Sequence, residues 1–378
     1  MIEDKKHIFK IDILRGIAII AVFLFHVQLA LFPDGIKKYG TNNFIESVTL
    51  ESFILNFSPV AFGWSGVQLF LLISGFLIHL GFLYKKEVIE ISTFYSKRFW
   101  RIYPPYLLIL IFFCLPENGI DFYFFTFKGL MLFFSHVFLV YNLYDYTFFG
   151  INASFWSLAL EIQLYLIYPL LLLTRKKIGI ERTLLLLVLL SFSLLIIGFF
   201  IGRIGTGIAY NSSVFKYWFI WCAGAYLAEK YFNNKKIIKR GAPIIISIGF
   251  ILTILSKIHL YTSYATIYLA TFTLLIFFEW FLTTEKMNSK TLLGTIISTI
   301  GICSYSFYLI HQPYLPDMFN FFQVAFKTQT YLTPYVIFIE VFLVFGIIFL
   351  ISYLLYLFIE LPSVKFGNEL RGRINKSR

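Results

Sequence analysis

Long, uninterrupted apolar runs are the feature that most constrains what this chain can fold into. A helix needs roughly 20 mostly apolar residues to cross the hydrocarbon core of a bilayer. Several runs reach that length, among them 183–202 and 264–283. Across the 378 residues, 59% are hydrophobic and only 14% are charged, so the composition excludes a soluble globular domain. We therefore expect an integral membrane protein.

These runs predict helices. A membrane strand alternates apolar and polar residues, and the runs show no such alternation. Inside hydrocarbon, a helix satisfies all of its own backbone hydrogen bonds. We expect an all-α, polytopic transmembrane protein with about ten spans. They are expected near residues 11–32, 60–83, 102–116, 155–174, 183–202, 214–232, 242–257, 264–283, 293–311 and 334–358.

An eleventh apolar segment, 121–141, is interrupted by Lys128 and His136. Charge decides how it is interpreted, because cytoplasmic loops carry an excess of lysine and arginine. If the N-terminus is cytoplasmic and this segment does not cross, most of the 32 Lys and Arg residues fall in cytoplasmic loops. If it crosses, every later basic loop lies outside. We therefore expect a re-entrant or outer interfacial segment, with both termini in the cytoplasm.

The sequence predicts one integral-membrane domain over 1–378, without an appended soluble domain. Its longest loop, about 33–59, is expected to lie outside. The net charge of +12 matches topology signals facing anionic lipid headgroups, so no nucleic-acid partner is expected. Cys114, Cys222 and Cys303 fall in or beside apolar spans, and their number and spacing suggest neither a disulfide framework nor a metal site.

Charged side chains inside a bilayer cost roughly 2.5–3.5 kcal/mol each on insertion scales, so they usually face a cavity or a partner. Arg15 and His26 are eleven residues apart, which returns to within about 20° of one helix face and separates them by about 16 Å. Arg15 could hold an anionic donor at the inner mouth, and the His26 imidazole could take a proton from a hydroxyl deeper in. Alternatively, Arg15 snorkels to the interface and His26 makes a buried hydrogen bond.

Two further segments carry candidate residues, and the cations of the second are expected at the cytoplasmic mouth. GWSGVQLFLLISGFLI (63–78) has small residues that allow close helix packing. FYSKRFWRIYPPYL (94–107) places Lys97, Arg98 and Arg101 before two prolines. These three cations could follow from the positive-inside rule alone, or they could bind donor phosphates.

Polar residues also mark the outer half. In FWSLALEIQLYLIYPLLLL (155–173), Trp156 is expected at the outer interface and Glu161 about 7 Å deeper. Glu161 could be a base, a sugar ligand or the structural partner of an arginine. SYSFYLIHQP (304–313) puts His311 near the outer end of its span, where a belt histidine is the simpler interpretation. Structural roles are expected for His79, His136, Glu279 and Glu340.

Read together, these segments resemble the acyltransferase-3 family of membrane acyltransferases. The first match is LRGIAIIAVFLFH, in which an arginine and a histidine are separated by ten residues, as they are in the family. The second is GVQLFLLISGFLI, which resembles the family's GVDLFFVLSGFLI. The third is FYSKRFWRIYPPYL, which resembles the family's FYxxRxxRIxPxxL. FWSLALEIQLYLIYPLLL, SYSFYLIHQP and FIELP resemble three further motifs. The motifs follow in family order along nearly the whole chain. One departure is Gln68, which stands where the family usually has Asp and can only hydrogen-bond.

The resemblance implies ten spans and transfer of an acyl group, commonly acetyl from cytoplasmic acetyl-CoA, to an extracytoplasmic carbohydrate, without a metal. The acceptor could be O-antigen, capsule, exopolysaccharide or a similar glycan, including a lipid-linked one, at a bacterial cytoplasmic membrane. By the resemblance, Arg15 and His26 are the essential pair, joined by Glu161, and Arg15, Lys97, Arg98 and Arg101 face the donor. The acceptor side is expected to include Trp156, His311, Ser74 and Gln68.

Three questions stay open at the level of sequence. His26 could act as a base or carry the acyl group itself, and the donor could be succinyl rather than acetyl. A transporter that flips a lipid-linked sugar or exports a small solute would also line a path with polar residues, although the chain lacks the internal repeat that many transporters have. A purely structural membrane subunit explains the ordered motifs poorly.

Overall fold

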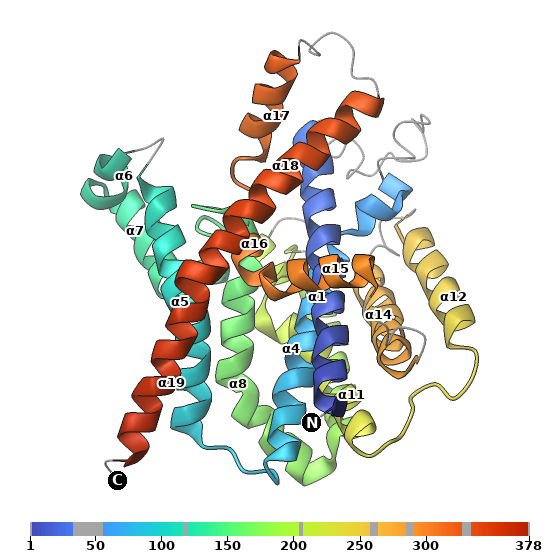
Figure 1. Cartoon of the computed structure of the whole chain (residues 1–378). Coiled ribbons are helices and arrows are strands. Elements are labelled where there is room, and N and C mark those ends of the chain that lie inside the picture. Colours follow the sequence, from blue (N-terminus) through green and yellow to red (C-terminus); the bar gives the residue numbers. More distant parts are fainter. Residues whose placement is uncertain are drawn as a thin grey trace. The chain divides into compact units, whose positions relative to one another are not determined.

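The computed structural model describes residues 2–32, 56–115, 119–203, 207–257, 264–284, 291–326 and 334–376. Most of these residues are helical, and none of them forms a strand, so the predicted all-α class is confirmed (Figure 1). The longer helices are α1 (Ile2–Leu31), α4 (Ser65–Tyr84), α5 (Ile91–Cys114), α8 (Trp156–Ile178), α9 (Ile180–Phe200), α11 (Val214–Phe232), α12 (Ala242–Leu255), α14 (Thr266–Thr283), α18 (Pro334–Leu355) and α19 (Leu361–Lys376). The shorter elements are α6 (Gly119–Phe125), α7 (Phe127–Val137), α10 (Ile208–Asn211), α15 (Leu292–Ile302), α16 (Ser304–Ile310), α17 (Leu315–Ala325), the π-helical turn η5 (Tyr356–Glu360) and the 3-10 turns η1 (Pro59–Phe62), η2 (Tyr141–Leu143) and η3 (Ala153–Phe155).

Helices occupy all ten positions at which spans are predicted. Within the described ranges, six helices are long and apolar enough to cross a membrane, or seven if α15 and α16 form one span. The multi-pass architecture is thereby confirmed, while the number of ten spans stays a prediction. The ninth predicted span is broken, because α15 and α16 meet at a 61° bend. The predicted outer loop near 33–59 lies largely outside the described residues.

The segment 121–141 contains two short helices, neither of which is long enough to span a bilayer. Thr126 separates α6 from α7, and its hydroxyl accepts a hydrogen bond of 3.0 Å from the backbone N–H of Gly129. A threonine in this position satisfies one of the free N–H groups at the start of a helix. The interruption therefore has a local cause, and it agrees with the expectation that this segment does not cross as one helix.

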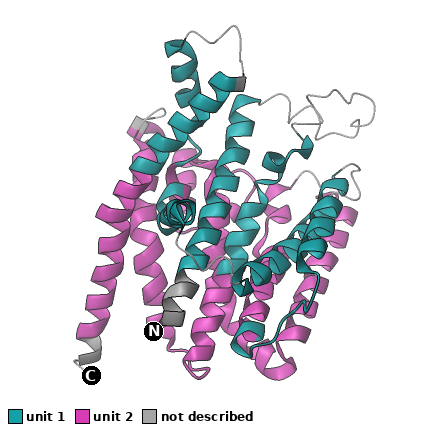
Figure 2. Ribbon diagram, turned by 45° about the vertical axis from the view of Figure 1, so that its right-hand side comes forward, with its two compact units in different colours: residues 1–73, 230–307, 311–350 teal, residues 74–229, 308–310, 351–378 magenta. Residues whose placement is uncertain are grey.

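The chain divides into two compact units (Figure 2). Unit 1 comprises residues 1–73, 230–307 and 311–350, and unit 2 comprises 74–229, 308–310 and 351–378. Each unit is described by itself below. The prediction of one membrane domain over 1–378 stays a prediction.

In unit 1, α15 crosses α1 at very close range, as Figure 1 also shows. Two glycines make this approach possible. A Cβ atom on Gly16 would lie 2.1 Å from the carbonyl oxygen of Ile297, and one on Gly301 would lie 1.7 Å from that of Asp12. Backbone thus packs directly on backbone beside Arg15. Elsewhere in the unit, α12 packs along α14.

In unit 2, α8 carries a row of polar side chains on one face. Glu161, Tyr165, Tyr168 and Arg175 are spaced by four, three and seven residues, a spacing that keeps them within a narrow sector of the helix. The row extends over about 21 Å, since each helical residue advances about 1.5 Å. The helices α5 and α19 pack against each other in the same unit, with Gly367 against the ring of Trp100.

Replacing Gly301 by alanine tests the close crossing. We expect G301A to lose about 1–3 kcal/mol of stability, because the new methyl group forces α1 and α15 apart. The measurement is the thermal unfolding midpoint of the detergent-solubilised protein. G346A in α18 is the matched control, since no atom lies within 4 Å of a Cβ placed there. Equal midpoints for the two variants would contradict the close crossing.

Candidate functional site

Unit 1 brings two histidines together that are 285 residues apart in the sequence. The Nε2 atom of His311 lies 3.1 Å from Nδ1 of His26, and the ring centroids are 4.9 Å apart. The same Nδ1 atom lies 2.9 Å from the carbonyl oxygen of Val22, one helical turn earlier on α1. His311 is fully buried and His26 is partly exposed. The sequence placed His311 near the outer end of a span but did not predict this contact.

The contacts fix the tautomer of His26. A carbonyl oxygen can only accept a hydrogen bond, so the hydrogen must sit on Nδ1 of His26. The Nε2 atom of His311 then accepts from the same N–H group. In neutral His26, Nε2 consequently carries the lone pair, and no described residue bonds to it. An imidazole held in this way is oriented to accept a proton or to act as a nucleophile.

Three phenylalanine rings pack against one another next to the histidine pair, and one of them, Phe307, stacks on His311 with centroids 6.2 Å apart. Phe23 on α1 meets Phe307 and Phe345 edge to face, with centroids 5.8 and 5.2 Å apart. Phe307 and Phe345 are 5.5 Å apart. Phe23 and Phe307 lie one turn before His26 and His311 in the sequence. Aromatic packing therefore anchors both segments that position the imidazoles.

Arg15 is on the same continuous helix as His26, as the spacing predicts. Its Nη1 atom lies 3.8 Å from the carboxylate of Asp12, three residues earlier. Their side chains are 19% and 13% exposed, so the pair is largely shielded. The sequence analysis did not single out Asp12, although a carboxylate three residues from a span arginine is a recognisable pairing.

Gln68 is 1% exposed, and neither polar atom of its amide finds a partner within the described part of the chain. A buried amide without a partner costs free energy of about 1–3 kcal/mol. The family aspartate that it replaces could pair with a cation, but the amide can only hydrogen-bond.

In unit 2, Glu161 ends a chain of hydrogen bonds. The hydroxyl of Tyr165 donates to its carboxylate. Ser74 Oγ lies 3.1 Å from the tyrosine oxygen, and Trp221 Nε1 donates to Ser74 Oγ over 3.2 Å. Because the tyrosine hydrogen is already used, Ser74 must donate to Tyr165. All three donors therefore point along one direction toward Glu161, which stays half-buried. Ser74 and Glu161 were both predicted, but not as members of one chain.

The three cations of the 94–107 segment do not form one group. Arg98 turns inward, where its guanidinium carbon lies 3.6 Å from the centroid of Phe94 and its Nη1 donates to the Phe94 carbonyl over 2.7 Å. Lys97 and Arg101 are exposed. Trp156, the first residue of α8, is partly buried between Phe148 and Tyr217.

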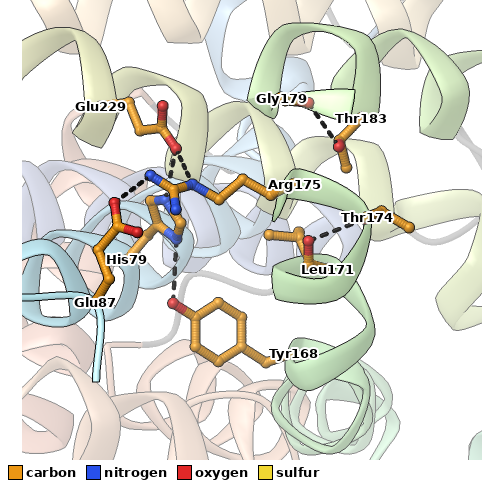
Figure 3. A network of polar contacts seen from close by, with 9 residues as sticks. All are labelled: His79, Glu87, Tyr168, Leu171, Thr174, Arg175, Gly179, Thr183 and Glu229. Carbon is orange, nitrogen blue, oxygen red and sulfur yellow. Dashed lines mark hydrogen bonds and ion pairs between the residues drawn. The ribbon is translucent and has the colours of Figure 1, made fainter. Parts of the chain in front are cut away.

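A second network occupies one end of unit 2 (Figure 3). The fully buried His79 lies 3.1 Å from Tyr168 Oη through Nδ1 and 3.1 Å from Glu229 through Nε2. Arg175 donates from Nε to the same Glu229 oxygen over 2.5 Å and from Nη2 to Glu87 over 2.7 Å. Nothing near His79 in the sequence predicts this network, because its partners Tyr168 and Glu229 come from α8 and α11.

The loop that supplies Glu87 is strained. Lys86 and Glu87 have φ angles of 55° and 61°, in the left-handed region that favours glycine. Their N–H groups bond back to Leu83 and Phe82, which closes the end of α4. Left-handed backbone costs roughly 1–2 kcal/mol at a residue with a side chain. An exposed ion pair contributes about 0.2–1 kcal/mol. The strain at either residue is therefore at least as large as the contribution of the Glu87–Arg175 pair, so this pair alone does not offset the strain.

The hydrogen bond from Arg175 lowers the pKa of the Glu87 carboxyl below its ordinary value. The ion pair is thus fully present above the ordinary pKa and is lost as the pH falls through the lowered one. Near neutral pH, Glu87 is ionised and bound to the guanidinium.

Other buried polar residues have structural roles. The carboxylate of Glu279 accepts hydrogen bonds from the backbone N–H groups of Ile237 and Ile238. His136 donates from Nδ1 to the Leu132 carbonyl over 2.7 Å and stacks on Tyr141. Among the residues that the structure describes, no group of three or more His, Cys, Asp or Glu residues could hold a metal ion.

The spacing and order of these residues match a known family. A sequence model of an acyltransferase domain covers residues 8–357. The chain belongs to the acyltransferase-3 family. No solved structure matches the chain.

Two curated relatives of this acyltransferase-3 member are bacterial. Peptidoglycan O-acetyltransferase OatA of Listeria monocytogenes is 28% identical over 211 residues, which cover 51% of this chain and 28% of that protein. O-acetyltransferase OatA of Staphylococcus aureus is 25% identical over 361 residues, which cover 88% of this chain and 57% of that protein. The chain therefore spans less than two thirds of the length of either relative.

Proposed function

We propose that the protein is a membrane O-acyltransferase that moves an acetyl group from cytoplasmic acetyl-CoA to a hydroxyl of a cell-envelope or exported carbohydrate. Family membership and the two O-acetyltransferase relatives support this class of reaction. The proposed location is the bacterial cytoplasmic membrane, with both termini in the cytoplasm, because the basic loops then lie inside.

The observation that carries the proposal is the arrangement of His26. Its Nδ1–H is bonded to the Val22 carbonyl and to His311, which leaves Nε2 as the reactive atom. A base of this kind must be within hydrogen-bond reach of the proton that it removes, and a fixed ring orientation meets that need. His311 is here a positioning residue, a more specific role than the acceptor-side position expected from the sequence.

Donor binding is assigned to cations. Arg15 lies about 16 Å along α1 from His26, a separation that suits a long donor with its phosphates at one end and its thioester at the other. Lys97, Arg98 and Arg101 are proposed to contribute to phosphate binding, with the exposed Lys97 and Arg101 the more accessible two.

Acceptor binding is assigned to residues that can contact a carbohydrate. Glu161, as the end of the chain from Trp221 through Ser74 and Tyr165, has lone pairs that can accept from sugar hydroxyls. Two further residues are proposed to lie on the acceptor side: Gln68, whose buried amide has no partner among the described residues, and Trp156, whose ring is partly exposed.

Two chemical routes fit this arrangement. In the first, Nε2 of His26 takes the hydroxyl proton, the sugar oxygen attacks the thioester carbonyl, and the carbon–sulfur bond breaks to release the thiolate. In the second, Nε2 attacks the thioester itself, the thiolate leaves, and the sugar hydroxyl then displaces the imidazole from the acyl group. Both end in the sugar ester and coenzyme A, with the proton returned to the thiolate.

Replacing His26 by asparagine tests the assignment directly. The amide of H26N keeps a donor for the Val22 carbonyl but removes Nε2, so we expect transfer to fall to background while expression is retained. Transfer of radiolabelled acetyl from acetyl-CoA to surface glycans is the measurement. H136N is the matched control, because His136 makes the same bond to a carbonyl four residues earlier. Transfer by H26N at the wild-type rate would show that the assignment of His26 as the reactive residue is wrong.

Trapping separates the two routes. Purified protein is incubated with radiolabelled acetyl-CoA in the absence of acceptor and then denatured. Label that stays on wild-type protein, is lost in H26N and is released by hydroxylamine supports the acyl-imidazole route. No label on a preparation that transfers normally once acceptor is added supports the base route.

The role of His311 can be tested by comparing alanine with glutamine. H311A removes one of the two acceptors of His26 Nδ1–H and leaves only the Val22 carbonyl. We expect kcat to fall by up to about tenfold, the worth of one hydrogen bond. The KM for acetyl-CoA should stay unchanged. H311Q offers an amide oxygen to the same N–H and should recover much of the rate. Equal rates for the two variants would indicate that His311 only fills space.

A further inference from the structure

We propose that Arg175 is a binding site for a phosphate-bearing anion, and that Glu87 occupies this site as an internal carboxylate that the anion displaces. The site lies at the end of unit 2 that the charge distribution assigns to the cytoplasm. None of its residues belongs to the motifs that carry the acyl-transfer proposal.

The two carboxylates on Arg175 are not equivalent. Glu229 comes from the helix α11, is 17% exposed and is also bonded by the buried His79 (Figure 3). Glu87 comes from the strained loop after α4 and is 52% exposed. Glu229 therefore fixes the guanidinium in place, whereas Glu87 can leave with relief of its left-handed backbone. Its departure frees Nη2 of Arg175.

The charges around Arg175 favour an anion as the group that replaces Glu87. With Glu87 removed, Arg175 and Glu229 balance each other, and Lys85 and Lys86 remain in the loop. Lys85, Arg98 and Arg371 lie close enough to Lys97 to repel its charge, and Glu90 lies close enough to attract it. Lys176 and Lys177 directly follow Arg175 on α8. Once Glu87 has left, these cations outnumber the two remaining carboxylates, Glu90 and Glu229.

The planar shape of the Arg175 guanidinium favours a phosphate group as this anion. A guanidinium presents its N–H groups as a planar fork, which matches the oxygens of a phosphate as it matches those of a carboxylate. Glu87 already accepts a hydrogen bond from one of these groups, Nη2. The phosphate could belong to the acyl donor, in which case the inference rests on the proposed function, or to an anionic lipid headgroup. In both cases the guanidinium would bind the same phosphate oxygens.

The test removes the Glu87 charge without removing the site. Full-length E87Q is placed in nanodiscs of phosphatidylcholine only, and binding of acyl-free coenzyme A is measured by titration calorimetry at low salt. We expect binding about two- to fivefold tighter than in wild type, since the competing ion pair is of that strength. E90Q is the matched control: it removes the same charge from the same loop, but among the described residues the carboxylates bonded to Arg175 are those of Glu87 and Glu229.

The strain argument predicts an effect in the opposite direction. K86G allows the left-handed backbone and so stabilises the loop with Glu87 in place, whereas K86A keeps the strain. Both remove the lysine charge. We expect coenzyme A to bind about two- to fivefold more weakly to K86G than to K86A.

A second arm identifies the source of the phosphate. Nanodiscs that also contain phosphatidylglycerol are used, and native mass spectrometry counts the lipids retained by E87Q and E90Q. Tighter coenzyme A binding by E87Q supports the donor as ligand; unchanged coenzyme A binding with more retained phosphatidylglycerol supports a lipid headgroup. If E87Q behaves like E90Q with both probes, the proposal is wrong. Because binding is read without turnover, that outcome leaves the acyltransferase proposal standing.

Discussion

The backbone contact between α1 and α15 is the constraint on which the rest of unit 1 depends. At Gly16 and Gly301 the two helices approach so closely that no side chain fits between them. The chain then bends by 61° after α15 and continues as α16 toward His311. The position of His311 beside His26 thus follows from a contact made ten residues earlier, where two residues lack side chains. Interiors packed at this density transmit small changes, so the glycines belong to the geometry of the site although they touch no reacting group.

The direction of a few hydrogen bonds determines how the buried polar side chains are oriented. The Val22 carbonyl can only accept, which decides where the His26 hydrogen lies and which nitrogen keeps its lone pair. In unit 2 the carboxylate of Glu161 has the same effect, because it orients Tyr165 and, through it, Ser74. In an apolar interior, each unpaired donor or acceptor costs about 1–3 kcal/mol, so one fixed acceptor determines the orientation of its neighbours. Gln68, which has no partner among the described residues, is the exception that most needs a ligand or a water molecule.

The sequence predicted the helical class, the positions of the helices and the interrupted segment 121–141, because these depend on local periodicity and on charge. It also placed Arg15 and His26 on one helix face, since their spacing alone decides that. It could not predict the contact between His26 and His311 or the partners of His79, because each joins residues from distant parts of the chain. Arg175 illustrates the limit well. In the sequence it is one basic residue of a loop predicted to be cytoplasmic, whereas in the fold it connects a helix to a strained turn. The break between α15 and α16 was missed for a different reason, since the run 293–311 contains no proline and its serines and glycines are compatible with an unbroken helix.

The one-way hydrogen-bond chain that ends on Glu161 also bears on which glycan can bind. Tyr165 donates to the carboxylate, which has no hydrogen of its own and therefore offers a bound sugar only acceptor capacity. An unmodified hydroxyl can supply the hydrogen that such an acceptor needs. In the proposed reaction the proton of the reacting hydroxyl goes to His26, so the hydroxyl that faces Glu161 would be a neighbouring one. If that neighbour already carries an ester, its hydrogen is gone and two oxygen lone pairs would face each other, so the carboxylate would distinguish unmodified glycan from glycan that is already modified at that position.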